Sequence, residues 1–194
     1  MRRTRVIVGL ALVAVAAALL IIALSGCAGS SHGRGSRPFS WLNPASAPSG
    51  WNIARTRGGA TLGYPPGWTP IKTDPGTASV ALLGNGQRID GYLNATPKQG
   101  TETLANWSRF RPQHNQGEGD RHERIIAATT DARFRSGRGA CVIDTYTTSK
   151  DSYREIACLV SGPRSTAVVV AAAPTSLWDQ QATHLERAVS SFFA

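Results

Sequence analysis

The chain has 194 residues, of which 41% are hydrophobic, and a formal net charge of +9. This length supports one globular domain with a proper core, and a second domain would be crowded. The lysines and arginines are scattered and do not alternate with aromatic residues, which argues against nucleic-acid binding. A diffusely basic surface instead favours contact with anionic lipid headgroups or acidic wall polymers.

Residues 1–26 have the pattern of a bacterial secretory signal peptide. Three arginines lie within the first five residues, and residues 6–24 are apolar apart from one glycine. Removal of this segment would lower the formal charge from +9 to +6, because these three arginines would leave with it. The basic residues precede the apolar run, which places the N-terminus in the cytoplasm and the rest of the chain outside.

Leu24-Ser25-Gly26-Cys27 resembles the lipobox of bacterial lipoproteins of the actinobacterial type. The resemblance implies that the Cys27 thiol receives a diacylglyceryl group and becomes the new N-terminus after cleavage. The protein would then be held at the cell membrane by acyl chains and face the extracytoplasmic side. The alternative is an uncleaved transmembrane helix over residues 6–24, whose length approaches the ~20 residues that span a bilayer.

Residues 28–50 are rich in Gly, Ser, Pro and Ala and show no sustained apolar period. We expect residues 27–50 to comprise the lipidated cysteine and a flexible tether. Phe39 and Trp41 lie in this segment and either dock on the domain or touch the membrane interface. Near Trp51 the pattern changes to short apolar runs separated by turn residues, so residues 51–194 are expected to form a single domain.

The first half of this domain predicts short strands. Residues 58–64 read as a strand that ends at Pro65-Pro66-Gly67, and residues 77–83 form a second apolar run. Gly84-Asn85-Gly86 predicts a tight reversal because Gly and Asn tolerate positive φ. Residues 88–95 follow with alternating character, which predicts a hairpin.

A helix is expected over residues 101–111, where Leu104, Trp107 and Phe110 recur at nearly helical spacing. Thr101 is the expected N-cap, and Pro112 is expected to end the helix. The polar, glycine-bearing residues 113–120 that follow are expected to form an exposed loop.

Strands return in the second half of the chain. The apolar runs that predict them cover residues 124–128, 132–136, 140–148, 153–160 and 166–172. Turns are expected at Thr130-Asp131 and at residues 137–139. A final helix is expected to begin after Thr175 or Ser176, with an apolar stripe that ends near Phe192.

The two remaining cysteines, Cys141 and Cys158, provide a test of strand register. If Thr147 pairs with Ser152 across the turn, Cys141 lies directly opposite Cys158. Opposed side chains in an antiparallel pair have Cβ atoms about 4.5–5.5 Å apart, close to the separation that a disulfide needs. The predicted export favours this bridge, because disulfides persist in oxidising compartments outside the cytoplasm. The alternatives are two buried thiols or a metal site, for which two cysteines supply too few ligands.

The densest group of polar side chains lies in the predicted loop and just after it: His114, Glu118, Asp120, His122 and Glu123. Such a group could bind a cation or supply a general base, but a solvated loop has the same composition. The chain contains no His-x-x-x-His, and its one Gly-x-Ser-x-Gly, at residues 29–33, lies in the predicted tether rather than on a strand-to-helix turn. We therefore expect no catalytic residue, no resident metal and no cofactor.

Arg133 and Arg135 alternate with Ala132 and Phe134, so both are expected on one face of a strand, with Arg138 in the next turn. The three arginines are a candidate site for a phosphate or carboxylate. A solvated face opposite the core-facing Phe134 is the alternative, and it is the favoured interpretation.

The order of these elements, with Tyr64-Pro65-Pro66-Gly67-Trp68 closing an early strand, resembles the PsbP-like α/β/α sandwich. The resemblance covers about residues 51–194. It implies an α+β fold, in which helices pack on an antiparallel sheet, and a binding or assembly role without catalytic residues. A cystatin-like or NTF2-like curved sheet is the alternative fold.

Two functions follow from these observations. The first is a membrane-anchored binding or assembly-accessory domain whose partner is an envelope protein or an anionic wall polymer. The second is an envelope enzyme, such as a hydrolase of wall or lipid material. A deep pocket that gathers His114, His122 and carboxylates would favour the enzyme, whereas a shallow apolar or arginine-lined groove would favour binding.

Overall fold

The computed structural model describes residues 37–194, which form one compact unit. The predicted signal peptide and Cys27 lie outside the described residues. Within residues 37–194, no helix is both long enough and apolar enough to cross a bilayer. Phe39, Trp41 and Leu42 pack against the hydrophobic core. Part of the predicted tether therefore belongs to the domain, which begins earlier than the expected Trp51.

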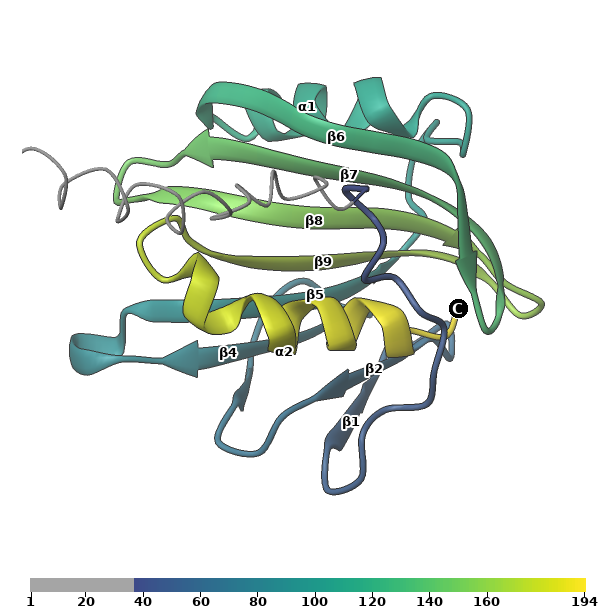
Figure 1. Cartoon of the computed structure of the whole chain (residues 1–194), viewed down its shortest axis with the longest axis horizontal. Helices are drawn as coiled ribbons and strands as arrows, with labels where there is room; N and C mark the ends of the chain where they lie inside the picture. Colours follow the sequence, from purple (N-terminus) through teal and green to yellow (C-terminus); the bar gives the residue numbers. More distant parts are fainter. Residues whose placement is uncertain (1–36) are drawn as a thin grey trace, which may run out of the picture. The chain divides into compact units, whose positions relative to one another are not determined.

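The strands of the described chain form two antiparallel sheets (Figure 1). The small sheet pairs β1 (Asn52–Arg55) with β2 (Thr61–Tyr64). The large sheet has the order β3-β4-β5-β9-β8-β7-β6. Its strands are β3 (Thr69–Ile71), β4 (Ala78–Leu83), β5 (Ile89–Pro97), β6 (Arg121–Phe134), β7 (Gly137–Thr147), β8 (Ser152–Ser161) and β9 (Thr166–Pro174).

Two α-helices cover opposite faces of the large sheet (Figure 1). Helix α1 (Trp107–Gly117) packs on β6, β7 and β8, whereas α2 (Trp178–Ser191) packs on β9, β8, β5 and β2. A 3₁₀ turn, η1 (Asn85–Gln87), joins β4 to β5, as the predicted reversal required. The expected α+β class, with a mid-chain and a C-terminal helix on an antiparallel sheet, is confirmed.

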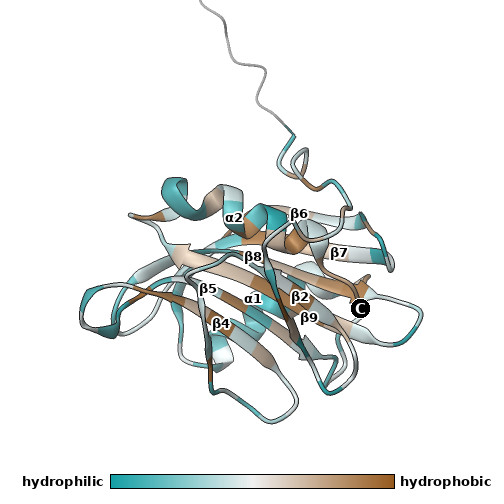
Figure 2. Ribbon diagram, turned by 90° about the horizontal axis from the view of Figure 1, so that it is seen from below, coloured by the Kyte–Doolittle hydropathy of each residue, from teal (hydrophilic) through white to brown (hydrophobic). Residues whose placement is uncertain are grey.

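The alternation of side chains along the central strands divides the hydrophobic residues between two cores. The larger core lies on the α2 face and includes Leu93, Ile156 and Val169 together with Leu185 and Phe192. The smaller core lies under α1 and is built on Trp107, Val142, Ala157, Leu159 and Val170. Figure 2 shows hydrophobic colour along the central strands and hydrophilic colour in several connecting loops.

The predicted disulfide is present and links Cys141 to Cys158, with a Cα–Cα distance of 4.1 Å. The register is the expected one, because Thr147 pairs with Ser152 and Cys141 pairs with Cys158 between β7 and β8. Both cysteines belong to the larger core, on the α2 face of the sheet. The bridge therefore cross-links two neighbouring strands within the larger core.

Replacing both cysteines with alanine is expected to lower the free energy of unfolding by about 3 kcal/mol, the loop-closure entropy of a bridge with a sequence separation of 17 residues. Urea denaturation with and without a reductant measures the loss. The reductant should destabilise the wild type by a similar amount and leave the double variant unchanged. Equal sensitivity of both proteins to the reductant would contradict a bridge at these positions.

Two expectations for the edge of the sheet are wrong. Residues 124–128 and 132–136 are not separate strands, because β6 runs without a break from Arg121 to Phe134. The pairing with β7 shifts between Thr129 and Ala132, so the expected turn at Thr130-Asp131 is a β-bulge. A bulge absorbs extra residues while both neighbours stay hydrogen-bonded. The expected turn at residues 137–139 is also wrong: Gly137 already pairs with Phe134, so these residues lie in β7 and the chain reverses at residues 135–136.

The expected ends of both helices also need correction. Helix α1 begins at Trp107 rather than after Thr101, continues through the buried Pro112 and ends at Gly117, within the stretch expected to be a loop. An interior proline costs about 3 kcal/mol, and buried contacts of α1 on both sides of it offset this cost. Helix α2 has Leu177 rather than Thr175 or Ser176 at its N-cap.

Candidate functional site

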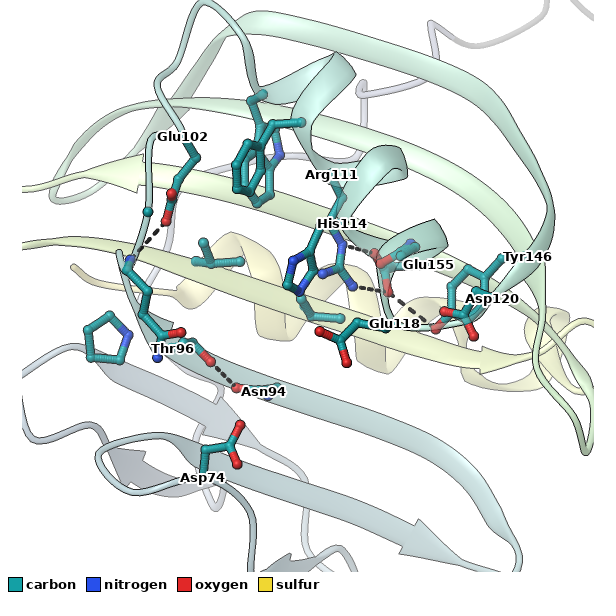
Figure 3. Close-up of a pocket in the computed structure, with 18 of the residues that line it drawn as sticks. Asp74, Asn94, Thr96, Glu102, Arg111, His114, Glu118, Asp120, Tyr146 and Glu155 are labelled. Carbon is teal, nitrogen blue, oxygen red and sulfur yellow. Dashed lines mark hydrogen bonds and ion pairs between the residues drawn. The ribbon is translucent and has the colours of Figure 1, made fainter.

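A cavity of about 520 Å³ lies between α1 and the neighbouring face of the large sheet (Figure 3). Helix α1 packs mainly on β6 to β8, and its Trp107 shares the smaller core with Val170 of β9. We call this cavity the α1 cleft. It is lined by Asp74, Tyr92, Asn94, Thr96, Pro97, Gln99, Gly100, Glu102, Trp107, Phe110, Arg111, His114, Asn115, Glu118, Asp120, Tyr146, Glu155, Val168 and Val170.

Two polar contacts fix α1 above β8. The indole Nε1 of Trp107 donates to the Ala157 carbonyl oxygen at 2.9 Å. One helical turn later, the Arg111 guanidinium donates to both carboxylate oxygens of Glu155, at 2.6 and 2.8 Å. Residues four apart on a helix are separated by about 6 Å, as are residues two apart on a strand. The two spacings match. Because the residue numbers rise along α1 while those of their partners fall along β8, the two elements run antiparallel.

The Arg111–Glu155 ion pair is buried at the base of the cleft, where the Glu155 side chain is 1% exposed. Burial alone would lower the pKa of Arg111, but the Glu155 charge outweighs it and raises this pKa above its usual value. Tyr146 donates to Glu155 Oε2 at 3.3 Å. Burial and the same carboxylate raise the pKa of Tyr146, so the phenol stays protonated and acts as a donor.

A second pair of carboxyls lies beside this ion pair. Asp144 is directly opposite Glu155 across β7 and β8, and its side chain interacts with Glu123 of β6. The carboxyl oxygens of Asp144 and Glu123 are buried, and within residues 37–194 the Asn115 side chain is the other polar group beside Glu123. Burial, followed by the charges of Glu155 and Glu123, raises the pKa of Asp144 to about 9. One proton shared between Asp144 and Glu123 satisfies both groups at neutral pH.

Because the pKa of Asp144 is raised in the folded state, the domain should lose stability as the pH rises from about 4 to about 9. Asp144→Asn keeps a permanent hydrogen-bond donor towards Glu123. This variant should raise the free energy of unfolding at pH 8 by roughly 1–3 kcal/mol and flatten its dependence on pH. Urea denaturation at pH 5 and pH 8 measures both effects.

Asp179→Asn, at an exposed position of α2, is the matched control and should keep the slope of the wild type. A slope that Asp144→Asn leaves intact would contradict the assignment of the proton to this pair.

The floor of the cleft is a row of polar side chains on β5. Leu93 and Ala95 point into the larger core, so the alternating Tyr92, Asn94 and Thr96 point towards the cleft. Thr96 Oγ1 donates to Asn94 Oδ1 at 2.8 Å, and Asn94 Nδ2 donates to the Tyr92 hydroxyl at 2.9 Å. These bonds hold the three side chains in place, and Figure 3 shows the one between Thr96 and Asn94.

The structure brings together part of the predicted loop site. His114 and Glu118, from α1 and its C-terminal end, and Asp120 line the cleft, but His122 does not. His122 is exposed, with a φ of 55° at the start of β6. His114 stacks on Phe110, with ring centroids 6.2 Å apart. Most of residues 113–120 are exposed, as expected, but they do not form a loop throughout, because helix α1 extends to Gly117.

One buried polar atom in the cleft lining, Glu102 Oε2, has no hydrogen-bond partner within residues 37–194, whereas the buried Asn115 amide faces the Glu123 carboxyl. Glu102 is 4% exposed, and its other carboxylate oxygen accepts from the Gln99 backbone N–H at 2.9 Å. Burial raises the pKa of Glu102, but backbone N–H groups beginning with that of Gln99 outweigh it and lower the pKa overall. Within the described chain, no three His, Cys, Asp or Glu residues converge to hold a metal ion.

The arginines proposed as an anion site lie outside the cleft. Arg133 and Arg138 face each other across β6 and β7, and Arg138 forms an exposed ion pair with Asp131 at 3.0 Å. Arg135 lies over the Phe193 ring, 6.0 Å from its centroid. Ala132 and Phe134 are buried, as the solvated-face interpretation requires. Anion binding by these three arginines stays a prediction.

Sequence reasoning did not identify several residues of the cleft, above all Arg111, Glu155 and Tyr146. Glu155 carried a signal, because it is a carboxylate at a core-facing position of a strand that is otherwise apolar from Ile156 to Val160. Its partner, Arg111, is 44 residues away in the sequence, and no local pattern joins the two.

Comparison with known proteins gives a fold but no family. No family model and no curated protein matches the chain. The solution structure of CyanoP, the cyanobacterial PsbP of Synechocystis sp. PCC 6803, aligns with a TM-score of 0.53 and 19% identity over 76% of this chain and 94% of that one. This likeness shows that the domain has the PsbP-like fold.

Two further solved structures align less closely. One is PA94 of Pseudomonas aeruginosa, a protein of unknown function, with a TM-score of 0.48 and 10% identity over 73% of this chain and 94% of that one. The other is LpqN of Mycobacterium tuberculosis, which is involved in cell envelope biogenesis. It aligns with a TM-score of 0.35 and 11% identity over 78% of this chain and 90% of its own.

Proposed function

We propose that this chain is a lipid-anchored, extracytoplasmic binding protein that takes its ligand in the α1 cleft. The observation that carries the proposal is the cleft itself, a cavity of about 520 Å³ with a fixed polar floor and aromatic walls. Ligand sites are concave and combine apolar walls with a few placed polar groups, and their volumes start at about 300 Å³. The α1 cleft has each of these properties.

The anchor and the location are supported by the N-terminal sequence and by the disulfide. Leu24-Ser25-Gly26-Cys27 follows a basic and then an apolar segment, as in bacterial lipoproteins. The Cys141–Cys158 bridge belongs to the chemistry of oxidising compartments outside the cytoplasm. An anchored domain of this kind would meet envelope proteins, wall polymers or small ligands that reach the membrane surface.

The cleft gathers His114 and carboxylates but not His122, so it meets the criterion for the enzyme only in part, and the state of Glu155 and His114 favours binding over catalysis. A general acid or base must be free to exchange its proton with a substrate. Glu155 is held by Arg111 and Tyr146, and His114 stacks on Phe110 without a carboxylate partner. The side chains of the cleft are therefore arranged to position a ligand by charge and hydrogen bonding.

Filling the cleft should abolish ligand binding without unfolding the domain. Asn94→Trp places a large ring on the floor of the cleft, whereas Asn52→Trp places the same ring at an exposed position of β1. Saturation-transfer NMR of the full chain in detergent, with a mixed set of cationic, neutral and anionic fragments, measures binding. We expect fragment signals with the wild type and Asn52→Trp and a loss of at least tenfold with Asn94→Trp. Fragments that bind all three proteins equally would contradict a ligand site in the cleft.

The lipid anchor has its own test. Cys27→Ala removes the only thiol that the lipobox assigns to acylation, so the variant should lose the added acyl mass and its membrane association. Intact mass spectrometry and membrane partition after expression in a bacterial host measure both. A variant that stays in the membrane with residues 1–26 attached, and a wild type without acyl mass, would show a transmembrane helix instead.

A further inference from the structure

The α1 cleft has the opposite charge to the protein around it. Five of the twelve acidic residues line it: Asp74, Glu102, Glu118, Asp120 and Glu155. Among the lysines and arginines of residues 37–194, only Arg111 lines it, and Glu155 already neutralises that charge. The cleft is thus acidic within a chain whose net charge is +9. The basic surface elsewhere repels cations, whereas the negative potential of the cleft attracts them, so cations would be directed into this cavity.

The negative potential acts on the cleft's own side chains. Burial, followed by the charge of Glu155, raises the pKa of Asp120, and Arg111 offsets only part of this effect. Glu118 adds to it from the end of α1. A bound cation would relieve the repulsion among these carboxylates, which is a contribution to binding that a neutral ligand cannot make.

A buried acceptor in the cleft points independently to a ligand that donates hydrogen bonds. Glu102 is 4% exposed, and its Oε2 has no donor within residues 37–194. Leaving a buried acceptor unpaired costs about 1–3 kcal/mol, and a ligand N–H would remove that cost. Asn115 Nδ2 does not add to this argument, because the Glu123 carboxyl lies beside it as an acceptor.

The spacing of the carboxylates selects an extended organic cation over a metal ion. Figure 3 shows Glu102 towards one end of the cleft and Asp120 beside Tyr146 towards the other. Within the described chain no three acidic or histidine side chains converge on one point. A metal ion needs ligands at a single centre, whereas an amine or guanidinium compound satisfies carboxylates along its length.

We propose that the ligand of the α1 cleft is an organic cation, a polyamine or a guanidinium compound, whose N–H groups donate to Glu118, Asp120 and Glu102. This inference rests on the proposed function and names the class of its ligand. The side chains of Tyr92 and Phe110 supply the aromatic surface that such cations also contact.

Isothermal titration calorimetry of the full chain in detergent with spermidine tests the inference, with citrate as the anionic control. The Glu118→Gln/Asp120→Asn double variant removes two carboxylates at solvent-accessible positions. Asp179→Asn on α2, across the sheet, removes one exposed carboxylate outside the cleft and is the matched control. Circular dichroism establishes that each variant is folded.

We expect saturable binding of spermidine to the wild type, an affinity at least tenfold lower in the double variant, and no change in Asp179→Asn. Equal binding to all three proteins, or binding of citrate in place of spermidine, overturns the cationic ligand. If Asn94→Trp still removes fragment binding in that case, the cleft remains a ligand site and only the proposed charge of its ligand is wrong. If Asn94→Trp removes no binding, the proposed function and this inference both fail.

Discussion

The cleft depends on how α1 is docked on β8. Trp107 reaches a backbone carbonyl and Arg111 reaches Glu155, one turn further along the helix. Loss of one partner from such a buried ion pair typically costs about 3–5 kcal/mol, because the other charge is left without compensation. The two contacts place α1 mainly above β6 to β8, with the cleft beside it. The same contacts carry the helix through Pro112 and bring His114 and Glu118 to the rim.

The two faces of the large sheet have different roles. The α2 face carries the larger hydrophobic core and the disulfide. Within residues 37–194, the α1 face carries a buried ion pair, the buried carboxyls of Asp144 and Glu123, and a Glu102 oxygen without a partner. Such groups contribute less to stability than apolar packing does, and proteins keep them at functional sites. The well-packed, cross-linked α2 face therefore stabilises the domain, and the α1 face presents charged groups that a ligand can bind.

How much the sequence predicts depends on the range of the interactions. The register of β7 and β8 is local, because a short turn joins them, so Cys141 and Cys158 could be paired from the sequence. The bulge in β6 and the passage of α1 through Pro112 depend on neighbouring strands, and local turn and helix rules predicted breaks there. The cleft joins residues 44 and 50 positions apart, so its centre, Glu155, could be recognised only as an isolated carboxylate in an apolar strand.

The proposed function requires that the space between α1 and β5 is a ligand site rather than a gap that closes in solution. A crystal structure of the chain grown with spermidine distinguishes the two. We expect Arg111 on Glu155, an open cleft, and electron density for the amine beside Glu118 and Asp120. A structure in which α1 has moved onto β5 and fills the cavity, or in which the amine binds elsewhere and the cleft holds only water, would contradict this expectation.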